Sequence, residues 1–599
     1  MRCREVSKDV TLGDCLSFRG FQFMKSLLCF LLLAPNLLFA ELSVPHFFSD
    51  HMILQRECAA AIWGKANAGA EVTVSFKGKS SSTQVGADGK WRAQVETGAA
   101  DAKGAVLTIS AGKQKIEIQD VLVGEVWFAS GQSNMFYTMN RSPEYAGLIA
   151  ESNHPALRMF NAPLVTAADN QEDIDGSWKV ATPETVPDYS AVAFFFARKL
   201  HLELGIPVGV IKSAWGGKPV ETFTSREALN TLPGTKELVD AMLKDESGYD
   251  QTKADAAYAT KMEQWKATMA AAKGKSAEER KRLPKKPDAP KRPLLTEGKP
   301  GVLFAAMIHP FVGYTMRGAI WYQGEGNAKP GAVPYDQTLP LMINDWRKRW
   351  ADEFSFYYVQ LASYHAPSTE PGTPDPWALC QDRMRLVLGT TPKTGMAITN
   401  DVGEANDIHP KNKKDPGERL ARLALAKDYS KELIYSGPLF KSNRVKEGAI
   451  RVTFDQSGVG LKSRDGGALK RFEIAGADKV WKWAEARIDG ADSVIVSSAE
   501  VKVPVAVRYA WAANPEGANL INSDGLPASL FRTDDWDDVE VKVDATAATA
   551  AADRRALGVE IRKIASERAK LDRKSPEYEL LTKKHEELMA KFKQGAPKK

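Results

Sequence analysis

The sequence predicts an α/β protein in which a parallel sheet flanked by helices forms the centre, with β-rich modules before and after it. Between residues 121 and 430, short apolar runs alternate with stretches of helical spacing, a pattern typical of a parallel sheet covered on both faces. On either side of this region, short strand-like runs are divided by Gly, Asn and Asp turns, as in sandwiches and barrels. The chain has 599 residues, more than one hydrophobic core usually holds, so several domains are expected.

The central region, 121–430, is predicted to form the largest domain. Helices are expected at 190–204, 336–350 and 377–389. An interruption at 235–300 is rich in Ala, Lys and Glu and ends in a Pro/Lys stretch, which predicts a helical insertion followed by an extended linker. The strands are expected at Val126–Ala129, Val208–Ser213, Ala319–Tyr322, Phe356–Leu361 and Met396–Thr399.

The flanking regions are predicted as separate modules. Residues 41–120, with strand-like runs such as Glu71–Phe76, are expected to form a β-sandwich-like module. Residues 431–543, with runs such as Ser493–Ser497, predict a second β-rich module. The last segment, 544–599, is Ala-rich and then Lys/Glu-rich with helical spacing, so a charged helical tail is expected there.

The N-terminus has the pattern of an export signal. Met24 and Lys25 precede an apolar run, Leu27–Ala40, that is short for a membrane span and ends in a small residue. Segment 1–40 is therefore predicted to be a signal and pre-segment cleaved after Ala40. This predicts a secreted or periplasmic protein without membrane contact after cleavage, and an uncleaved membrane anchor is the alternative.

Composition argues against several classes of function. The formal net charge of +6 is modest for this length, and much of the Lys lies in two local stretches, so no nucleic-acid partner is predicted. Three of the five cysteines lie in the expected signal segment. The remaining two, Cys58 and Cys380, are far apart and match neither a disulfide framework nor a zinc pattern. No metal or other cofactor is predicted.

A serine motif follows the first predicted strand of the central region. The sequence Gly131-Gln132-Ser133-Asn134-Met135 comes directly after that strand, and a serine on a strand-to-helix turn is exposed at the carboxyl edge of the sheet. Met135 stands where the Gly-x-Ser-x-Gly elbow has its last glycine, so this is not an ordinary α/β-hydrolase motif. Ser133 is the candidate nucleophile, and a polar turn is the alternative.

Two further loops follow later strands and offer hydrogen-bond donors. Gly216 and Gly217 come just after the second strand, and paired glycines let the backbone approach a ligand and present an N–H to an oxyanion. Asn327 ends a Gly324-x-x-Asn327 loop after the third strand, and its amide can donate to a developing negative oxygen. A tight turn and a helix cap are the alternatives.

His409 is the candidate base among the eight histidines. It follows the last predicted strand and has Asp407 two residues upstream. A histidine beside its own orienting carboxylate suits nucleophilic catalysis, in which the base takes the proton of a serine. A histidine with a purely structural role is the alternative.

Taken in order, the serine, glycine, asparagine and histidine motifs resemble the SGNH hydrolase superfamily. Within it, five segments are similar to bacterial sialate O-acetylesterases, which share a family with some acetylxylan esterases. The resemblance spans about residues 42–540. Its segments are Gly124–Met135, Ser213–Glu221, Ala305–Asn327, Asp407–Lys413 with Arg419-Leu420, and Val507–Trp511 with Gly525–Ser529.

The resemblance implies an SGNH-hydrolase-like parallel sheet with β-rich modules and acetyl-ester hydrolysis without a metal. It implies that Ser133 attacks, that His409 activates it, and that Ser133, Gly216 or Gly217, and Asn327 form the oxyanion hole. Substrate contacts are expected from neighbouring polar residues, namely Gln132, Gln323 and Glu325.

The acid departs from the superfamily pattern, which places it three residues before the histidine. That position is Asn406, which cannot supply a negative charge, whereas Asp407 lies two residues before His409. Asp407 is the predicted acid because it is the closest upstream carboxylate. A more distant carboxylate such as Asp401, or a Ser133–His409 dyad without an acid, is the alternative.

These observations together predict a secreted serine esterase whose partner is an acetylated carbohydrate, with 9-O-acetylated sialic acid as the first choice. Acetylated xylan is an alternative substrate. Sialic acid carries a carboxylate that a basic residue near the pocket would bind, and the sequence does not place such a residue. A non-catalytic carbohydrate-binding surface protein is the alternative from another class, because its β-rich flanks would suit that role.

Overall fold

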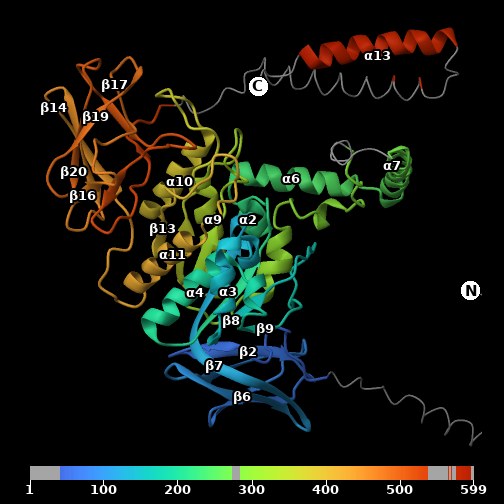
Figure 1. Ribbon diagram of the computed structural model, residues 1–599. Helices are drawn as coiled ribbons and strands as arrows, with labels where there is room; N and C mark the ends of the chain where they lie inside the picture. Colours follow the sequence, from blue (N-terminus) through green and yellow to red (C-terminus); the bar gives the residue numbers. More distant parts are fainter. Residues whose placement is uncertain (1–40, 273–282, 537–563, 565–567, 569–574, 595–599) are drawn as a thin grey trace, which may run out of the picture.

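The computed structural model describes residues 41–272, 283–536, 564, 568 and 575–594 (Figure 1). Within them the chain is a mixed α/β protein, with a central, mostly parallel sheet between helices and β-rich structure before and after it. This confirms the predicted fold class at that level. The expected signal segment, 1–40, and most of the expected tail, 544–599, lie outside the described residues.

Seven strands form the central sheet in the order β13-β12-β11-β7-β10-β8-β9, and all neighbours are parallel except β8 and β9. The first of these strands in the chain, β7, lies in the middle of the sheet. Strands β8, β9 and β10 lie on one side of it, and β11, β12 and β13 lie on the other side. Such a reversal opens a crevice at the carboxyl ends of the central strands. The strands are β7 Gln114–Gly131, β8 His154–Asn161, β9 Trp178–Ala181, β10 Val208–Ala214, β11 Gly318–Tyr322, β12 Ser355–Val359 and β13 Thr394–Ala397.

The five strands expected in the central region correspond to β7, β10, β11, β12 and β13, while β8 and β9 are not among those predicted. Pro155 and Arg158 interrupt the apolar pattern of β8. Arg158 is nevertheless buried, because its guanidinium forms an ion pair with Asp120 at 2.8 Å. The helices that cover the sheet are α4 Ala191–Leu204, α9 Tyr335–Trp350, α10 Pro376–Thr390 and α11 Lys414–Lys427.

Each face of the sheet is buried under one pair of helices. In β7, Phe128 packs into the core that includes α9 and α10, whereas Trp127 packs into the core that includes α4 and α11. Trp321 and Tyr322 of β11 divide between the two cores in the same way. Full burial of such a side chain stabilises the fold by about 1.5–3 kcal/mol. Burial on both faces explains why these strands are continuous apolar runs rather than alternating ones.

The N-terminal module shares β7 with the central sheet. The first half of β7 pairs with β6 and β1, and its second half pairs with β10 and β11. The strand bends at Asp120, whose φ is 53°, where the pairing with β6 is irregular. The boundary expected at residue 120 therefore lies within a single strand. The other strands of the module are β1 Ile53–Gln55, β2 Ala59–Lys65, β3 Glu71–Phe76, β4 Lys79–Gln84, β5 Lys90–Glu96 and β6 Asp101–Ala111.

The C-terminal module is built from short antiparallel strands around a core of its own that includes Phe472, Tyr509 and Phe531. The strands lie in three sheets. They are β14 Leu439–Lys446, β15 Ala449–Asp455, β16 Leu461–Ser463, β17 Phe472–Ala475, β18 Trp481–Trp483, β19 Glu485–Ile488, β20 Ser493–Ser497, β21 Ala506–Tyr509, β22 Leu520–Asn522 and β23 Phe531–Arg532.

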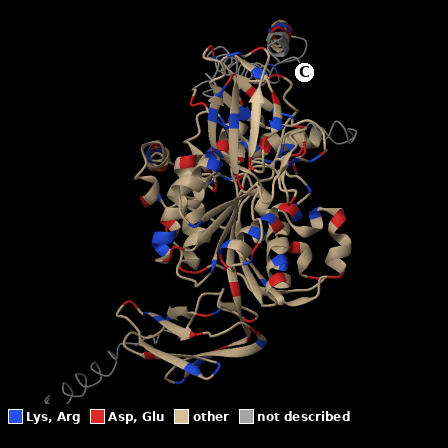
Figure 2. Cartoon of the chain, turned by 90° about the vertical axis from the view of Figure 1, so that its left-hand side faces the viewer, with Lys and Arg blue, Asp and Glu red and all other residues tan. Residues whose placement is uncertain are grey.

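The segment expected as a helical insertion contains α6 Pro233–Ser247 and α7 Gln251–Ala271, and α13 Pro576–Gln594 lies in the tail (Figure 1). No helix among the described residues is long and apolar enough to cross a membrane. Basic and acidic residues are interspersed over the side of the chain shown in Figure 2.

Gly131, the last residue of β7, is expected to tolerate no side chain. Its φ is 134°, and a methyl group there would lie 2.2 Å from the carbonyl oxygen of Tyr322. Gly131→Ala should therefore lower the free energy of unfolding by about 3 kcal/mol or more, measured by urea denaturation. Gly69→Ala is the control, because its φ is 77° but no atom lies within 4 Å, so only about 1–2 kcal/mol should be lost. Equal losses in the two variants would contradict the clash.

Candidate active site

Four loops at the carboxyl edge of the central sheet carry the predicted site residues. Because β10, β7 and β11 are adjacent and parallel, the loops that follow them meet at one edge. The fourth loop lies between β13 and α11. In chain order the loops contain Gln132 and Ser133, then Gly216 and Gly217, then Gln323, Glu325 and Asn327, and finally Asp407 and His409.

Ser133 begins the short helix α2 (Ser133–Phe136) directly after β7. The backbone N–H of Gln132 donates to the carbonyl of Tyr322 at 2.9 Å, which extends the pairing with β11 by one residue. Beyond that bond the chain turns into the helix. Ser133 itself stays half-buried, so its hydroxyl lies at the crevice rather than in the core.

Of the two glycines, Gly216 is the one beside the serine. A methyl group on Gly216 would lie 3.3 Å from Cβ of Ser133, whereas one on Gly217 would have no atom within 4 Å. The N–H of Trp215 donates to the carbonyl of Gly131 at 3.0 Å and so ties this loop to the serine turn. The sequence leaves the choice between the glycines open, and the geometry favours Gly216.

Gln132 and Gln323 tie the three strand-end loops together. Nε2 of Gln323 donates to Oε1 of Gln132 at 3.2 Å and to Oδ1 of Asn327 at 2.8 Å. It also donates to the carbonyl of Lys218 at 3.3 Å. The N–H of Gly326 donates to the same Oε1 of Gln132 at 3.1 Å. Gln132 is buried and Gln323 is 0% exposed, so both belong to the framework under the site. Their expected contact with substrate stays a prediction.

Asn327 is bound to a buried carboxylate. Its Nδ2 lies 3.1 and 3.0 Å from the two carboxylate oxygens of Glu221, and its Oδ1 accepts from the N–H of Val220 at 3.0 Å. Burial raises the pKa of the Glu221 carboxyl group, and the bond from Asn327 opposes that rise. Because Nδ2 carries two hydrogens, one can bind Glu221 while the other is left for an oxyanion.

His409 and Asp407 lie together in a tight turn. Oδ1 of Asp407 accepts from the backbone N–H of His409 at 2.9 Å and lies 3.4 Å from Nδ1 of the imidazole. The first contact is the turn that an Asp side chain makes with the residue two positions later. Burial lowers the pKa of His409 below its ordinary value, Lys413 and Arg141 lower it further, and Asp407 raises it.

Asp401, the alternative acid, forms ion pairs with two arginines. Its carboxylate accepts from Arg419 at 2.6 and 3.0 Å and from Arg464 at 2.9 Å. Arg419 belongs to α11 and Arg464 to the C-terminal module, so this ion pair joins two parts of the chain. The arrangement favours Asp407 as the carboxylate that faces His409.

Asn134 connects the serine turn to the histidine loop. Its Nδ2 donates to the carbonyl of Ile408 at 3.1 Å and to Oε1 of Glu325 at 2.5 Å. Asn134 follows Ser133 and Ile408 precedes His409, so one amide joins the backbones beside the predicted nucleophile and base. The carboxylate of Glu325 points into this framework, and its expected role in binding substrate stays a prediction.

Comparisons with known proteins identify the family. The chain is 33% identical to a carbohydrate acetylesterase from Xanthomonas citri, and the two structures agree with a TM-score of 0.69 over 83% of this chain and 100% of that one. It is 29% identical to the sialate O-acetylesterase of Rattus norvegicus and 27% identical to that of Homo sapiens, over 81% of this chain and 93% and 91% of those proteins. The chain belongs to the sialate O-acetylesterase family. No protein-family model matches the chain.

The esterase is thus a carboxylic ester hydrolase, as the sequence predicts. Three residues of its site are not among those predicted, namely Asn134, Glu221 and Lys413. Each lies inside one of the segments that carry the family resemblance, so a signal was present in the sequence. What the sequence lacks is the partner of each side chain, because each of the three binds at least one residue of another loop.

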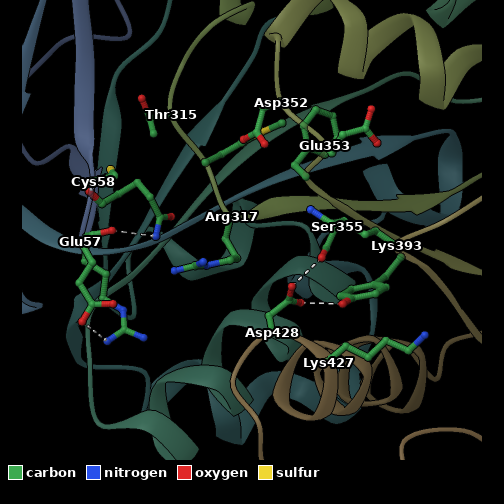
Figure 3. A pocket seen from close by; sticks show the side chains of 15 residues that line it. Glu57, Cys58, Thr315, Arg317, Asp352, Glu353, Ser355, Lys393, Lys427 and Asp428 are labelled. Atoms are coloured by element: carbon green, nitrogen blue, oxygen red, sulfur yellow. Dashed lines mark hydrogen bonds and ion pairs between the residues drawn. The ribbon is translucent and has the colours of Figure 1, made fainter.

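Two cavities of the esterase differ in their relation to this site. A cavity of about 710 Å³ borders Asn327 and is lined in part by Lys329, Glu237 and Arg383. A second cavity of about 380 Å³ lies at the amino ends of β11 and β12, where the Asp428 carboxylate accepts hydrogen bonds from Ser355 and Tyr357 (Figure 3). Only the first lies at the carboxyl edge, where ligands of such sheets bind. No cluster of His, Cys, Asp and Glu among the described residues could hold a metal.

The choice between the two glycines of the esterase can be tested by adding a methyl group to each. Gly216→Ala should lower kcat by about tenfold to a hundredfold, because the methyl group crowds Ser133 at 3.3 Å. Gly217→Ala should chiefly cost stability, about 1–2 kcal/mol, because its φ is 70° and its surroundings are open. Initial rates and melting curves separate the two effects. A larger loss of kcat in Gly217→Ala would reverse the assignment.

Proposed function

We propose that this esterase removes O-acetyl groups from sugars by a Ser133–His409–Asp407 mechanism, with 9-O-acetylated sialic acid as its substrate. The observation that carries the mechanism is the bond from Asn134 to Ile408, which brings the serine turn and the histidine loop to one edge of the sheet. The similarity to sialate O-acetylesterases and to a carbohydrate acetylesterase supports the substrate class.

In the proposed reaction, Nε2 of His409 takes the proton of Ser133 as its hydroxyl attacks the acetyl carbonyl. The N–H groups of Ser133 and Gly216 and one hydrogen of Asn327 Nδ2 stabilise the tetrahedral oxyanion. The protonated His409 then gives its proton to the departing sugar oxygen, which leaves as a hydroxyl group. A water molecule, deprotonated by His409, releases acetate by the same route. Asp407 stabilises the imidazolium that forms in each half of the cycle.

The cavity beside Asn327 is the proposed site of the sugar. Lys329 and Arg383 line it and supply positive charge, which suits a sugar that carries a carboxylate. Glu237 also lines it, and Arg383 lies 3.6 Å from Asp336, so part of that charge is neutralised. The proposal includes export, on the strength of the apolar run Leu27–Ala40.

Ser133→Ala should lower acetate release from 9-O-acetyl sialic acid by about 10⁴-fold or more, because the nucleophile is lost. His409→Ala should be nearly as severe, and the double variant no worse than either single one, because nucleophile and base act as a unit. Circular dichroism of each variant checks the fold. Substantial turnover by Ser133→Ala would overturn the assignment.

The same assay on acetylated xylan and simple acetylated sugars tests the substrate. Higher kcat/KM on the sialic acid ester supports the proposal, and higher kcat/KM on xylan replaces it with a xylan esterase. An intact, folded chain that binds these sugars but releases no acetate would be the carbohydrate-binding protein considered as the alternative.

The pH dependence of kcat/KM distinguishes Asp407 from Asp401. Because burial lowers the pKa of His409, the acidic limb of the wild type should lie below the ordinary histidine value of about 6.5. Asp407 raises that pKa, so Asp407→Asn should move the limb to lower pH and lower kcat by about tenfold to a hundredfold. Asp401→Asn should leave the limb in place and lower the melting temperature, since Arg419 and Arg464 lose their partner. The reverse pattern would make Asp401 the acid.

A further inference from the structure

A buried lysine binds the histidine loop at the residue after His409. Lys413 is 0% exposed and immediately precedes α11. Its Nζ donates to Oδ1 of Asn134 at 2.7 Å and to the carbonyl of Pro410. It also lies 4.6 Å from the ring centre of Tyr137. The three ammonium hydrogens therefore have two oxygen acceptors and one aromatic face.

The amide of Asn134 lies between a cation and a carboxylate. Its Oδ1 faces the ammonium group of Lys413, and its Nδ2 faces Oε1 of Glu325. An amide flipped by 180° would set its N–H groups against the ammonium and its oxygen against the carboxylate, so only one orientation is compatible with both neighbours. In that orientation the second Nδ2 hydrogen points to Ile408.

The backbone is thereby held on both sides of His409. The carbonyl before the histidine, that of Ile408, accepts from Asn134, and the carbonyl after it, that of Pro410, accepts from Lys413. Asn134 is the residue next to Ser133. The position of the base relative to the nucleophile therefore depends on one buried, charge-balanced group of three side chains.

Both charges of this group are costly to bury alone. Oε2 of Glu325 is sealed from solvent and has no hydrogen-bond partner among the described residues. Burial raises the pKa of Glu325 and lowers that of Lys413 to about 7, while each charge favours the other. Two buried charges that an amide bridges contribute little net stability, so their presence at this place points to a role in positioning.

We infer that Lys413 is a positioning residue of the esterase: acting through Asn134 and balanced by Glu325, it fixes His409 against the Ser133 turn. The inference rests on the proposed function of Ser133 and His409. Loss of Lys413 would release Pro410 and let the amide of Asn134 rotate. A misplacement of the base by about 1 Å costs about a hundredfold in rate.

The test compares Lys413→Met, Lys413→Arg and the matched control Lys427→Met, which removes a lysine of α11 bonded to the carbonyl of Thr394 at the other end of that helix. Lys413→Met should lower kcat by about tenfold to a hundredfold and change KM by less than about threefold. Lys413→Arg should keep a larger part of the wild-type kcat than Lys413→Met, because arginine keeps the positive charge and the hydrogen-bond donors. Lys427→Met should behave as the wild type.

The pH profile provides a readout that a merely structural role would not move. The charged groups that act on His409 are Asp407, which raises its pKa, and Lys413 and Arg141, which lower it. Without the positive charge of Lys413, the pKa of His409 rises, so the acidic limb of kcat/KM in Lys413→Met should move to higher pH. An unmoved limb, or a full wild-type kcat, would overturn the inference.

The double variant Lys413→Met/Glu325→Gln separates positioning from stability. Glu325→Gln removes the carboxylate that Lys413→Met leaves unpaired, while the glutamine oxygen can still accept from Asn134. The double variant should regain melting temperature but not kcat. Recovery of kcat along with stability would show that the unpaired charge, and not the position of His409, caused the loss. If the wild type releases acetate and Ser133→Ala does not, the proposed function stands whatever Lys413 does.

Discussion

The continuous pairing of β7 is the constraint on which the rest of the structure depends. Its first half belongs to the N-terminal module and its second half is the middle of the central sheet, so no linker separates the two. The hydrogen bond from Gln132 to Tyr322 carries the pairing up to the residue before Ser133. The turn that carries Ser133, the proposed nucleophile, thus stands at the end of a strand that pairs with four others. Its position follows from the sheet and not from the loop alone.

Around that strand end, the site is built by buried polar groups that face one another. Gln323 joins the loops after β7, β10 and β11, and Asn134 joins the first of these to the loop that contains His409. Each of these amides has its donors and acceptors paired with particular atoms, which fixes its orientation. The ionisable side chains of this framework are Glu221, Glu325 and Lys413, and all three are buried away from water. In the proposed mechanism, the groups that contact the acetyl ester are Ser133, Gly216, Asn327 and the imidazole of His409.

Much of this site can be predicted from the sequence, and the exceptions share one cause. A serine, a glycine pair, an asparagine and a histidine that each follow a strand are visible as local patterns, and parallel strands bring such positions to one edge. Gln323 and Glu325 lie in the same pattern, and from the sequence they are expected to touch substrate. The structure buries their polar ends against neighbouring loops, and their contact with substrate stays a prediction. Local sequence shows that a polar residue lies at the edge, but not whether its side chain points toward the crevice or toward a neighbouring loop.

By itself, the sequence determined the class of fold, the alternation of strands and helices in the central region, and the order of the motifs, because periodicity and turn residues are local properties. It missed β8, since Arg158 is buried only through its ion pair with Asp120, a residue far away in the chain. Only the tertiary structure decided that Gly216 rather than Gly217 lies beside Ser133. Only the tertiary structure, too, shows that Asp401 forms ion pairs with two arginines and that Lys413 donates a hydrogen bond to Asn134. Each of these choices depends on contacts between segments distant in sequence, and such contacts leave no periodic trace in the chain.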